Sequence, residues 1–154
     1  MDSIKKPKNS VTSSGSFTFD SSPLKEVHAF WLAGMSCDGC SIAAVGAQNP
    51  SVDQLLRAAI PGLPKIVLHH PVLSVTAGDE FLEAWHKAKK GELGAPYVLL
   101  FEGSVADEKI AGKYGGYWSA MGVNTDELGV SKPIPTSKWL DDLAPGAAAV
   151  VAVG

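Results

Sequence analysis

Four apolar runs divide the sequence from residue 25 onward. They cover residues 27–34, 64–71, 96–104 and 147–154, and each is interrupted by few polar residues. Near-continuous runs of this length are typical of strands that are buried on both faces of a parallel sheet. We therefore expect four parallel strands.

The segments between these runs have apolar residues at the three- and four-residue spacing of an amphipathic helix. Segment 49–62 contains Ser51 and Gln54 at capping-box spacing. Segment 78–91 begins with acidic residues and ends with lysines and a glycine, and 136–146 predicts a third, shorter helix. Alternating strands and helices predict a doubly wound α/β fold, a flavodoxin-like parallel sheet in three α/β/α layers.

Two regions depart from this alternation. Residues 1–24 are rich in Ser, Lys and Pro, so we expect a flexible tail ahead of a domain over 25–154. Segment 104–135 is Gly-rich and without regular periodicity, and is expected to be a long irregular loop. Such a loop is usually functional or an interface. Its three aromatic residues, Tyr114, Tyr117 and Trp118, favour a docking surface over a plain surface insertion, with Tyr117 and Trp118 as the expected interface residues.

Length and charge narrow the class of protein. A chain of 154 residues suits one domain with a real core, and a net charge of −3 implies no broad cationic surface for nucleic acid. No apolar run approaches the ~18 residues of a membrane span. Residues 1–24 contain no apolar signal core and no twin-arginine motif, so we expect a protein of the cytoplasm, or of the cytoplasmic face of a membrane through its partners.

Cys37 and Cys40 are the only cysteines in the sequence. They follow the first predicted strand, at the edge of a doubly wound sheet where ligands bind. Residues 41–45 resemble the start of a helix, and Gly39 is expected to let the loop fold back. Both sulfurs would then point to one place.

This pair of thiols is compatible with several kinds of site. The two cysteines could be inert structural residues. They could also form a thioredoxin-like redox pair, although such pairs normally carry a Trp or Pro beside the cysteines. Zinc needs two more ligands, and His69 and His70 point to opposite faces of a strand, so at most one of them could contribute. Binding of a nucleotide or of FMN at the same edge is a further alternative, although the phosphate-binding glycine motifs of such sites are absent. An iron–sulfur cluster needs four ligands, so two would come from elsewhere.

Several short motifs occur in a distinctive order between residues 26 and 154. They are FWLAGMSCDGCSIAA, NPSVDQLL, PGLPKIVLHHPVLS, LLFEGSV, GGYW and SKWLDDLAPGAAAVVAVG. This order closely resembles the start of the small, electron-transferring subunit of NiFe hydrogenases. A cluster-bearing subunit of respiratory NADH:quinone oxidoreductase is less similar, because its first two cluster cysteines are adjacent.

The resemblance implies a role for the two thiols. Cys37 and Cys40 would ligate a proximal 4Fe–4S cluster, which takes electrons from a nickel–iron centre in a separate large subunit and passes them to a downstream acceptor. The protein would be part of an oxidoreductase acting on hydrogen, with no catalytic residue of its own. The residues expected near the cluster are Ser36, Asp38, Gly39, Ser41, Glu102 and Gly103. Family members carry further cysteines after the fourth strand, so we expect this chain to be an N-terminal piece of a longer subunit, with the remaining ligands beyond residue 154.

Two finer expectations concern the polar residues around the thiols. Glu102 ends a very apolar strand, so its carboxyl should be desolvated and its pKa shifted, either to tune the cluster or to move protons. The alternative is a solvated carboxylate at a strand end. Backbone amides of residues 35–41 and the hydroxyls of Ser36 and Ser41 are expected to donate to cluster sulfurs.

Overall fold

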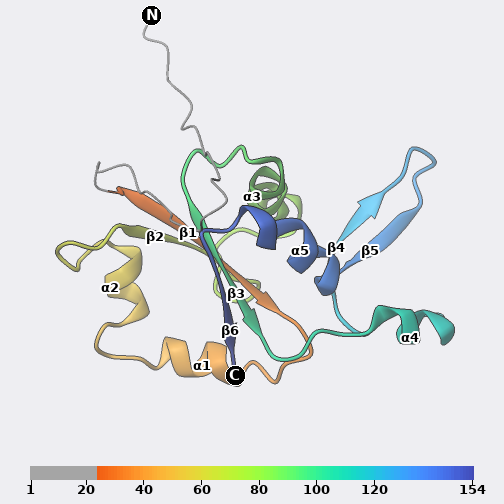
Figure 1. Ribbon diagram of the computed structural model, residues 1–154, viewed down its shortest axis with the longest axis horizontal. Coiled ribbons are helices and arrows are strands. Elements are labelled where there is room, and N and C mark those ends of the chain that lie inside the picture. Colours follow the sequence, from red (N-terminus) through yellow and green to blue (C-terminus); the bar gives the residue numbers. More distant parts are fainter. Residues whose placement is uncertain (1–23) are drawn as a thin grey trace, which may run out of the picture.

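A computed structural model describes residues 24–154 of the chain. Its centre is a four-stranded parallel sheet with the order β2-β1-β3-β6 (Figure 1). The predicted strands and the flavodoxin-like order are confirmed. The expected tail over residues 1–24 lies outside the described residues, apart from Leu24. The strands are β1 (Glu26–Ala33), β2 (Lys65–His69), β3 (Tyr97–Glu102) and β6 (Ala149–Val153).

Helices cover the two faces of this sheet unequally. The helices α3 (Gly78–Lys90) and α5 (Thr136–Leu143), with the 3-10 turn η1 (Ala144–Gly146), pack on one face and enclose the main core. That core joins Phe30 and Leu99 of the strands to Trp85 and Trp139 of the helices. The short helices α1 (Gly39–Val45) and α2 (Val52–Leu56) cover the other face over an apolar cavity of about 240 Å³. No helix within residues 24–154 is both long enough and apolar enough to cross a membrane.

The ends of α3 agree with the signals in the sequence, whereas those of α2 agree only at its start. Helix α3 has acidic residues in its first turn and ends at Gly91, whose φ of 71° is left-handed. Helix α2 forms the predicted capping box, since Ser51 Oγ accepts from Gln54 N (3.2 Å) and Ser51 N donates to Gln54 Oε1 (2.9 Å). However, α2 ends at Leu56, and Ala58 already has a positive φ of 53°. The helix is therefore shorter than segment 49–62 suggests.

Segment 104–135 is not the long irregular loop that the sequence predicts. It contains the helix α4 (Glu108–Lys113) and a hairpin of β4 (Ala120–Thr125) and β5 (Ser131–Pro135), which project to one side of the sheet (Figure 1). Most hairpin side chains are exposed, so the strands lack the apolar alternation that would have revealed them. The hairpin packs against the core through Ile134 and Met121.

The prediction that all four strands are buried on both faces is wrong for the outer pair. Strands β1 and β3 are largely buried, whereas β2 is only partly buried and β6 is mostly exposed. Val150 and Val151, which point to opposite faces of β6, are 49% and 44% exposed. The reason is that β2 and β6 form the edges of this sheet, so each has a neighbouring strand on one side only.

Candidate functional site

The two cysteines lie at the carboxyl edge of the sheet, as expected. We call residues 34–41, which connect β1 to the first turn of α1, the dicysteine loop. Cys37 is exposed and Cys40 is partly buried. The loop is attached to the residues after β3 by a two-way backbone bridge, in which Met35 N donates to Ser104 O (2.9 Å) and Ser104 N to Met35 O (3.3 Å).

Gly103 allows the backbone after β3 to reach this loop. Its φ of 83° is left-handed, and a Cβ built on it would lie 2.5 Å from Met35 O and 2.8 Å from Ser36 Cβ. Any other residue would therefore be strained and would collide with the loop. The glycine of the Glu-Gly-Ser motif is thus required by the close approach of two backbone segments.

The turn between the cysteines differs from the expectation in one detail. Asp38, and not Gly39, adopts the left-handed conformation, with a φ of 58°. The Asp38 amide donates to Ser36 Oγ (2.9 Å), which secures the turn. Gly39 contributes space instead, because a Cβ at this position would lie 3.2 Å from Cys37 Sγ.

Glu102 is the buried polar centre of the site. Its side chain is 2% exposed and accepts four hydrogen bonds. Trp31 Nε1 (2.9 Å) and Ser41 Oγ (2.6 Å) donate to Oε2. Ser36 Oγ (2.8 Å) and the Cys40 amide (3.2 Å) donate to Oε1. The carboxylate thereby joins the ends of β1 and β3 to both halves of the dicysteine loop.

These bonds determine the charge state of Glu102. Burial alone raises its pKa, but the hydrogen bonds from Ser41, Ser36, Trp31 and the Cys40 amide outweigh burial and lower the pKa to about 2. The expectation of a desolvated, shifted carboxyl is confirmed. In this structure the hydroxyls of Ser36 and Ser41 both donate to Glu102, and their donation to cluster sulfurs stays a prediction. The amides of Met35, Asp38 and Cys40 also have protein acceptors.

The two histidines at the end of β2 point to opposite faces, as predicted. His70 is 2% exposed and lies beside Ser41, with 2.8 Å between its Nε2 and Ser41 Oγ. His69 lies on the α3 side, where its Nε2 is 2.8 Å from His28 Nδ1 and its ring stacks on Phe30. Residues 24–154 contain no group of three or more His, Cys, Asp and Glu side chains arranged to hold a metal ion.

Two members of the site were missed by the sequence reasoning. The sequence pattern places Trp31 only within an apolar strand and suggests His70 only as a possible zinc ligand. A weak signal was available for Trp31, because a buried indole N–H needs an acceptor and the next strand ends in a glutamate. No local signal connects His70 to Ser41, since 29 positions separate them.

The aromatic residues predicted for an interface lie outside the dicysteine loop. Tyr117 and Trp118 are 48% and 49% exposed in the connection between α4 and β4. The backbone amides of Trp118 and Ser119 both donate to the Glu108 carboxylate (3.0 Å each), which fixes this turn. The rings are therefore presented to solvent by an ordered backbone.

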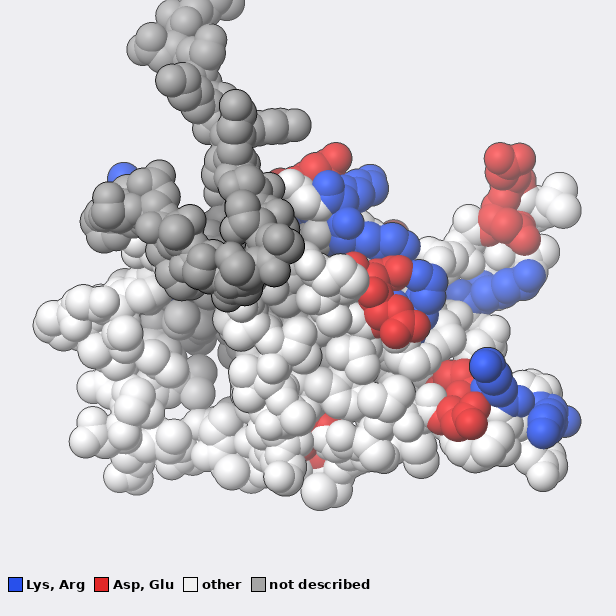
Figure 2. Space-filling view, in the orientation of Figure 1, with Lys and Arg blue, Asp and Glu red and all other residues white. Residues whose placement is uncertain are grey.

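The charged side chains are distributed unevenly over the surface. In Figure 2 they gather over α3, α5 and α4, whereas the surface over α1 and β6 is almost uncharged. Neither α1 nor the segment 143–154 contains a charged residue. The carboxyl edge that carries the cysteines thus borders a surface that is weakly hydrated.

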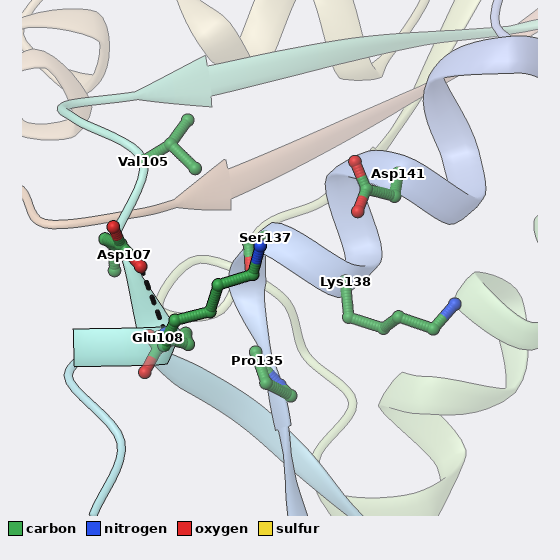
Figure 3. Close-up of a pocket in the computed structure, with 9 residues that line it drawn as sticks. Val105, Asp107, Glu108, Pro135, Ser137, Lys138 and Asp141 are labelled. Atoms are coloured by element: carbon green, nitrogen blue, oxygen red, sulfur yellow. Dashed lines mark hydrogen bonds between the residues drawn. The ribbon is translucent and has the colours of Figure 1, made fainter. Parts of the chain in front are cut away.

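Another hollow lies outside the dicysteine loop. It is an open depression of about 570 Å³ between the starts of α4 and α5, lined by Val105, Asp107, Lys138 and their neighbours (Figure 3). Its side chains carry charges of both signs, and Asp107 is already used to accept from the Lys109 amide (3.1 Å). None of the predicted site residues lines it.

Several known hydrogenases are similar to this chain in sequence and structure. An actinobacterial-type NiFe-hydrogenase from Ralstonia eutropha H16 is 49% identical with a TM-score of 0.73, over 84% of this chain and 36% of that chain. A recombinant [NiFeSe] hydrogenase from Desulfovibrio vulgaris Hildenborough is 31% identical with a TM-score of 0.62, over 84% and 40%. The periplasmic [NiFeSe] hydrogenase small subunit of Desulfomicrobium baculatum is 25% identical, over 84% of this chain and 38% of its own length. No protein-family model matches the chain.

The chain is a homologue of hydrogenase small subunits. The resemblance inferred from the motif order is confirmed. The chain spans less than half the length of the hydrogenase small subunit and the hydrogenase chains that it matches.

Proposed function

We propose that this chain is the cluster-bearing part of the electron-transferring small subunit of a NiFe hydrogenase. The observation that carries the proposal is the geometry of the dicysteine loop. Two thiols three positions apart lie at the carboxyl edge of a flavodoxin-like sheet, on a loop held by Glu102 and by the backbone bridge to Ser104. The hydrogenase relatives support the class of enzyme.

The residues present fit half of a 4Fe–4S ligand set. Such clusters are held by four ligands, usually thiolates, and Cys37 and Cys40 would be two of them. The space above Gly39 fits this role, because the absence of a Cβ there leaves room beside Cys37 Sγ. The other two ligands would come from outside residues 24–154. A bound cluster supplies reversible one-electron transfer.

The chain's own residues would hold and shield that group. Glu102 fixes the Cys40 amide and both serines, so the loop keeps its shape without help from the metal. The buried carboxylate also places a negative charge against the Cys40 amide. A nearby negative charge favours the oxidised form of a cluster, so Glu102 would lower its reduction potential.

The partner in this proposal is the hydrogenase large subunit. The weakly charged surface around α1 suits a permanent interface, which is typically large and apolar. Tyr117 and Trp118 would provide a second contact, since exposed aromatic side chains on an ordered turn are common anchors.

Binding of flavin or nucleotide at the same edge is the competing function, and the site disfavours it. A phosphate group at this position needs free backbone amides. Here the amides of Met35, Asp38 and Cys40 donate to protein acceptors. The Glu102 carboxylate behind them would repel an anion.

The test is Cys37→Ser in the full-length protein, produced anaerobically with its large subunit. We expect loss of about one cluster's iron, of the matching EPR signal after reduction, and of hydrogen-dependent dye reduction, because a hydroxyl is a poor cluster ligand. Asp38→Asn is the matched control, since Asn also tolerates the left-handed turn and no thiol is removed. Full iron content and full activity in the Cys37→Ser complex would refute the ligand assignment. Two resolved flavin absorbance bands, or a Cys37–Cys40 disulfide that cycles under thiol titration, would support a different function.

A further inference from the structure

The ends of three strands converge on the dicysteine loop. Trp31 comes from β1, His70 follows β2, and Glu102 ends β3. Trp31 and Glu102 are joined directly by a hydrogen bond, whereas His70 reaches Glu102 only through Ser41. His70 is therefore the one strand-end residue whose connection to the carboxylate depends on an intermediate hydroxyl.

The protonation of the His70 ring follows from its surroundings. Its Nδ1 faces the backbone amides of Val72 (3.1 Å) and Leu73 (3.3 Å), which can only donate. Nδ1 is therefore the acceptor nitrogen, and the proton of the neutral ring lies on Nε2. Nε2 lies 2.8 Å from Ser41 Oγ and donates to it.

This orientation of His70 decides the orientation of Ser41. A serine hydroxyl has one proton, and the lone pair that faces His70 is occupied by the Nε2–H donor. The proton must then point elsewhere, and Glu102 Oε2 lies only 2.6 Å away. With the opposite tautomer, Ser41 would turn its proton to the ring, and Glu102 would lose its closest donor.

We propose that His70 is a positioning residue for the dicysteine loop, which directs the Ser41 hydroxyl onto Glu102 so that the carboxylate holds the Cys40 amide at the start of α1. The chain of donors runs in one direction, from the backbone after β2 through His70 and Ser41 to Glu102. Cys40 N–H then meets the other carboxylate oxygen at 3.2 Å. A residue 30 positions away thus sets the geometry beside a thiol.

Simple packing of the ring is the alternative explanation. The His70 ring also contacts Trp31, with ring centroids 5.4 Å apart, and lines the apolar cavity beneath α1 and α2. If His70 only filled space, an apolar side chain of similar size could take its place without effect, whereas a polar one could not. The two roles therefore predict opposite orders for His70→Leu and His70→Gln.

The experiment measures amide hydrogen exchange of Cys40 by NMR in the full-length protein, metal-free and reduced. We expect His70→Leu and Ser41→Ala each to speed Cys40 exchange about tenfold, the effect of one lost hydrogen bond of this kind. His70→Gln should stay within about threefold of the wild type, because its side-chain N–H₂ can replace Nε2–H. The double variant His70→Leu/Ser41→Ala should exchange like either single variant, because the two residues act in series.

The control is His69→Leu, which alters the adjacent residue on the opposite face of the same strand. It should leave Cys40 exchange unchanged relative to its neighbours in α1. Equal Cys40 exchange in His69→Leu and His70→Leu would overturn the proposal, and so would a His70→Gln variant that is no better than His70→Leu. If His70→Leu fails to fold, Ser41→Ala decides, and unchanged Cys40 exchange in that variant overturns the proposal. The inference concerns the loop of the proposed function, but its readout contains no metal, so a failure to bind a cluster would leave it standing.

Discussion

Glu102 illustrates what a single residue contributes to this site. It is a buried anion with no cation among its hydrogen-bond partners, stabilised by neutral donors from a tryptophan, two serines and one backbone amide. Such donors favour the charged form, whereas burial disfavours it, and here the donors dominate. The carboxylate therefore acts as the anchor of the dicysteine loop.

Gly103 should be highly sensitive to substitution. We expect Gly103→Ala to destabilise the fold by about 3 kcal/mol or more, because it combines a left-handed φ with a steric clash against the loop. Urea unfolding of the full-length protein measures this effect. Reaction of Cys37 and Cys40 with a thiol reagent should also change, since the loop must move.

Gly94→Ala is the matched control for this variant. Gly94 has a similar φ of 77°, but a Cβ there would meet no atom within 4 Å. We expect a cost of about 1 kcal/mol from backbone strain alone. Equal destabilisation by the two variants would contradict the proposed contact between Gly103 and the loop.

At the scale of elements, the chain divides into parts with different tasks. The sheet with α3 and α5 forms the rigid body, because these elements contain nearly all of the large buried side chains. Helix α4 and the β4–β5 hairpin bury little and present Tyr117 and Trp118 on a turn fixed by Glu108. Such an element is suited to contact with a partner more than to stability.

A substitution in this turn tests its role in assembly. Under the proposed function, Trp118→Ala should weaken association with the large subunit about tenfold or more, because exposed aromatic anchors commonly contribute more than 1 kcal/mol. Co-purification at falling concentration, or a direct affinity measurement, gives the comparison. Leu63→Ala is the control, since Leu63 is 50% exposed, much like Trp118, and lies outside segment 104–135. Wild-type affinity of the Trp118→Ala protein would count against this surface.

At the scale of the whole molecule, buried titratable groups make stability depend on pH. Burial, with the nearby His28, lowers the pKa of His69 from 6.5 to about 4, and the pKa of Glu102 falls from 4.5 to about 2. In both cases the unfolded chain binds protons more readily than the folded one, so acid favours unfolding. Stability should be fully present above pH 6.5 and should fall first toward pH 4 and then toward pH 2.

The part of this loss that belongs to His69 can be isolated. We expect His69→Phe to flatten the stability profile between pH 6.5 and 4, because the neutral ring no longer has to resist protonation. Allowing for its partial exposure, the effect should be about 2 kcal/mol. Val67→Ala, two residues earlier on the same face of β2, is the control. Its loss of stability should be the same at every pH, because valine does not titrate. An unchanged slope in His69→Phe would show that other groups cause the acid loss.

The sequence by itself determined the order of strands and helices and the edge on which the cysteines lie. Apolar runs, helix periodicity and caps depend on neighbouring residues, so α3 and the four parallel strands could be predicted. The strand pattern placed Cys37 and Cys40 at the carboxyl edge of the sheet, and the resemblance to hydrogenase small subunits placed Glu102 near them. The β4–β5 hairpin was missed, since exposed strands bury too few side chains to create a pattern.

The tertiary structure alone decided how this site is held. The donors around Glu102 and the role of His70 depend on side chains that meet across 29 to 71 positions of sequence. Hydrogen bonds require particular distances and directions, which spacing along the chain does not encode. The burial of β2 and β6 was also decided at this level, because a strand's exposure depends on what lies beside it.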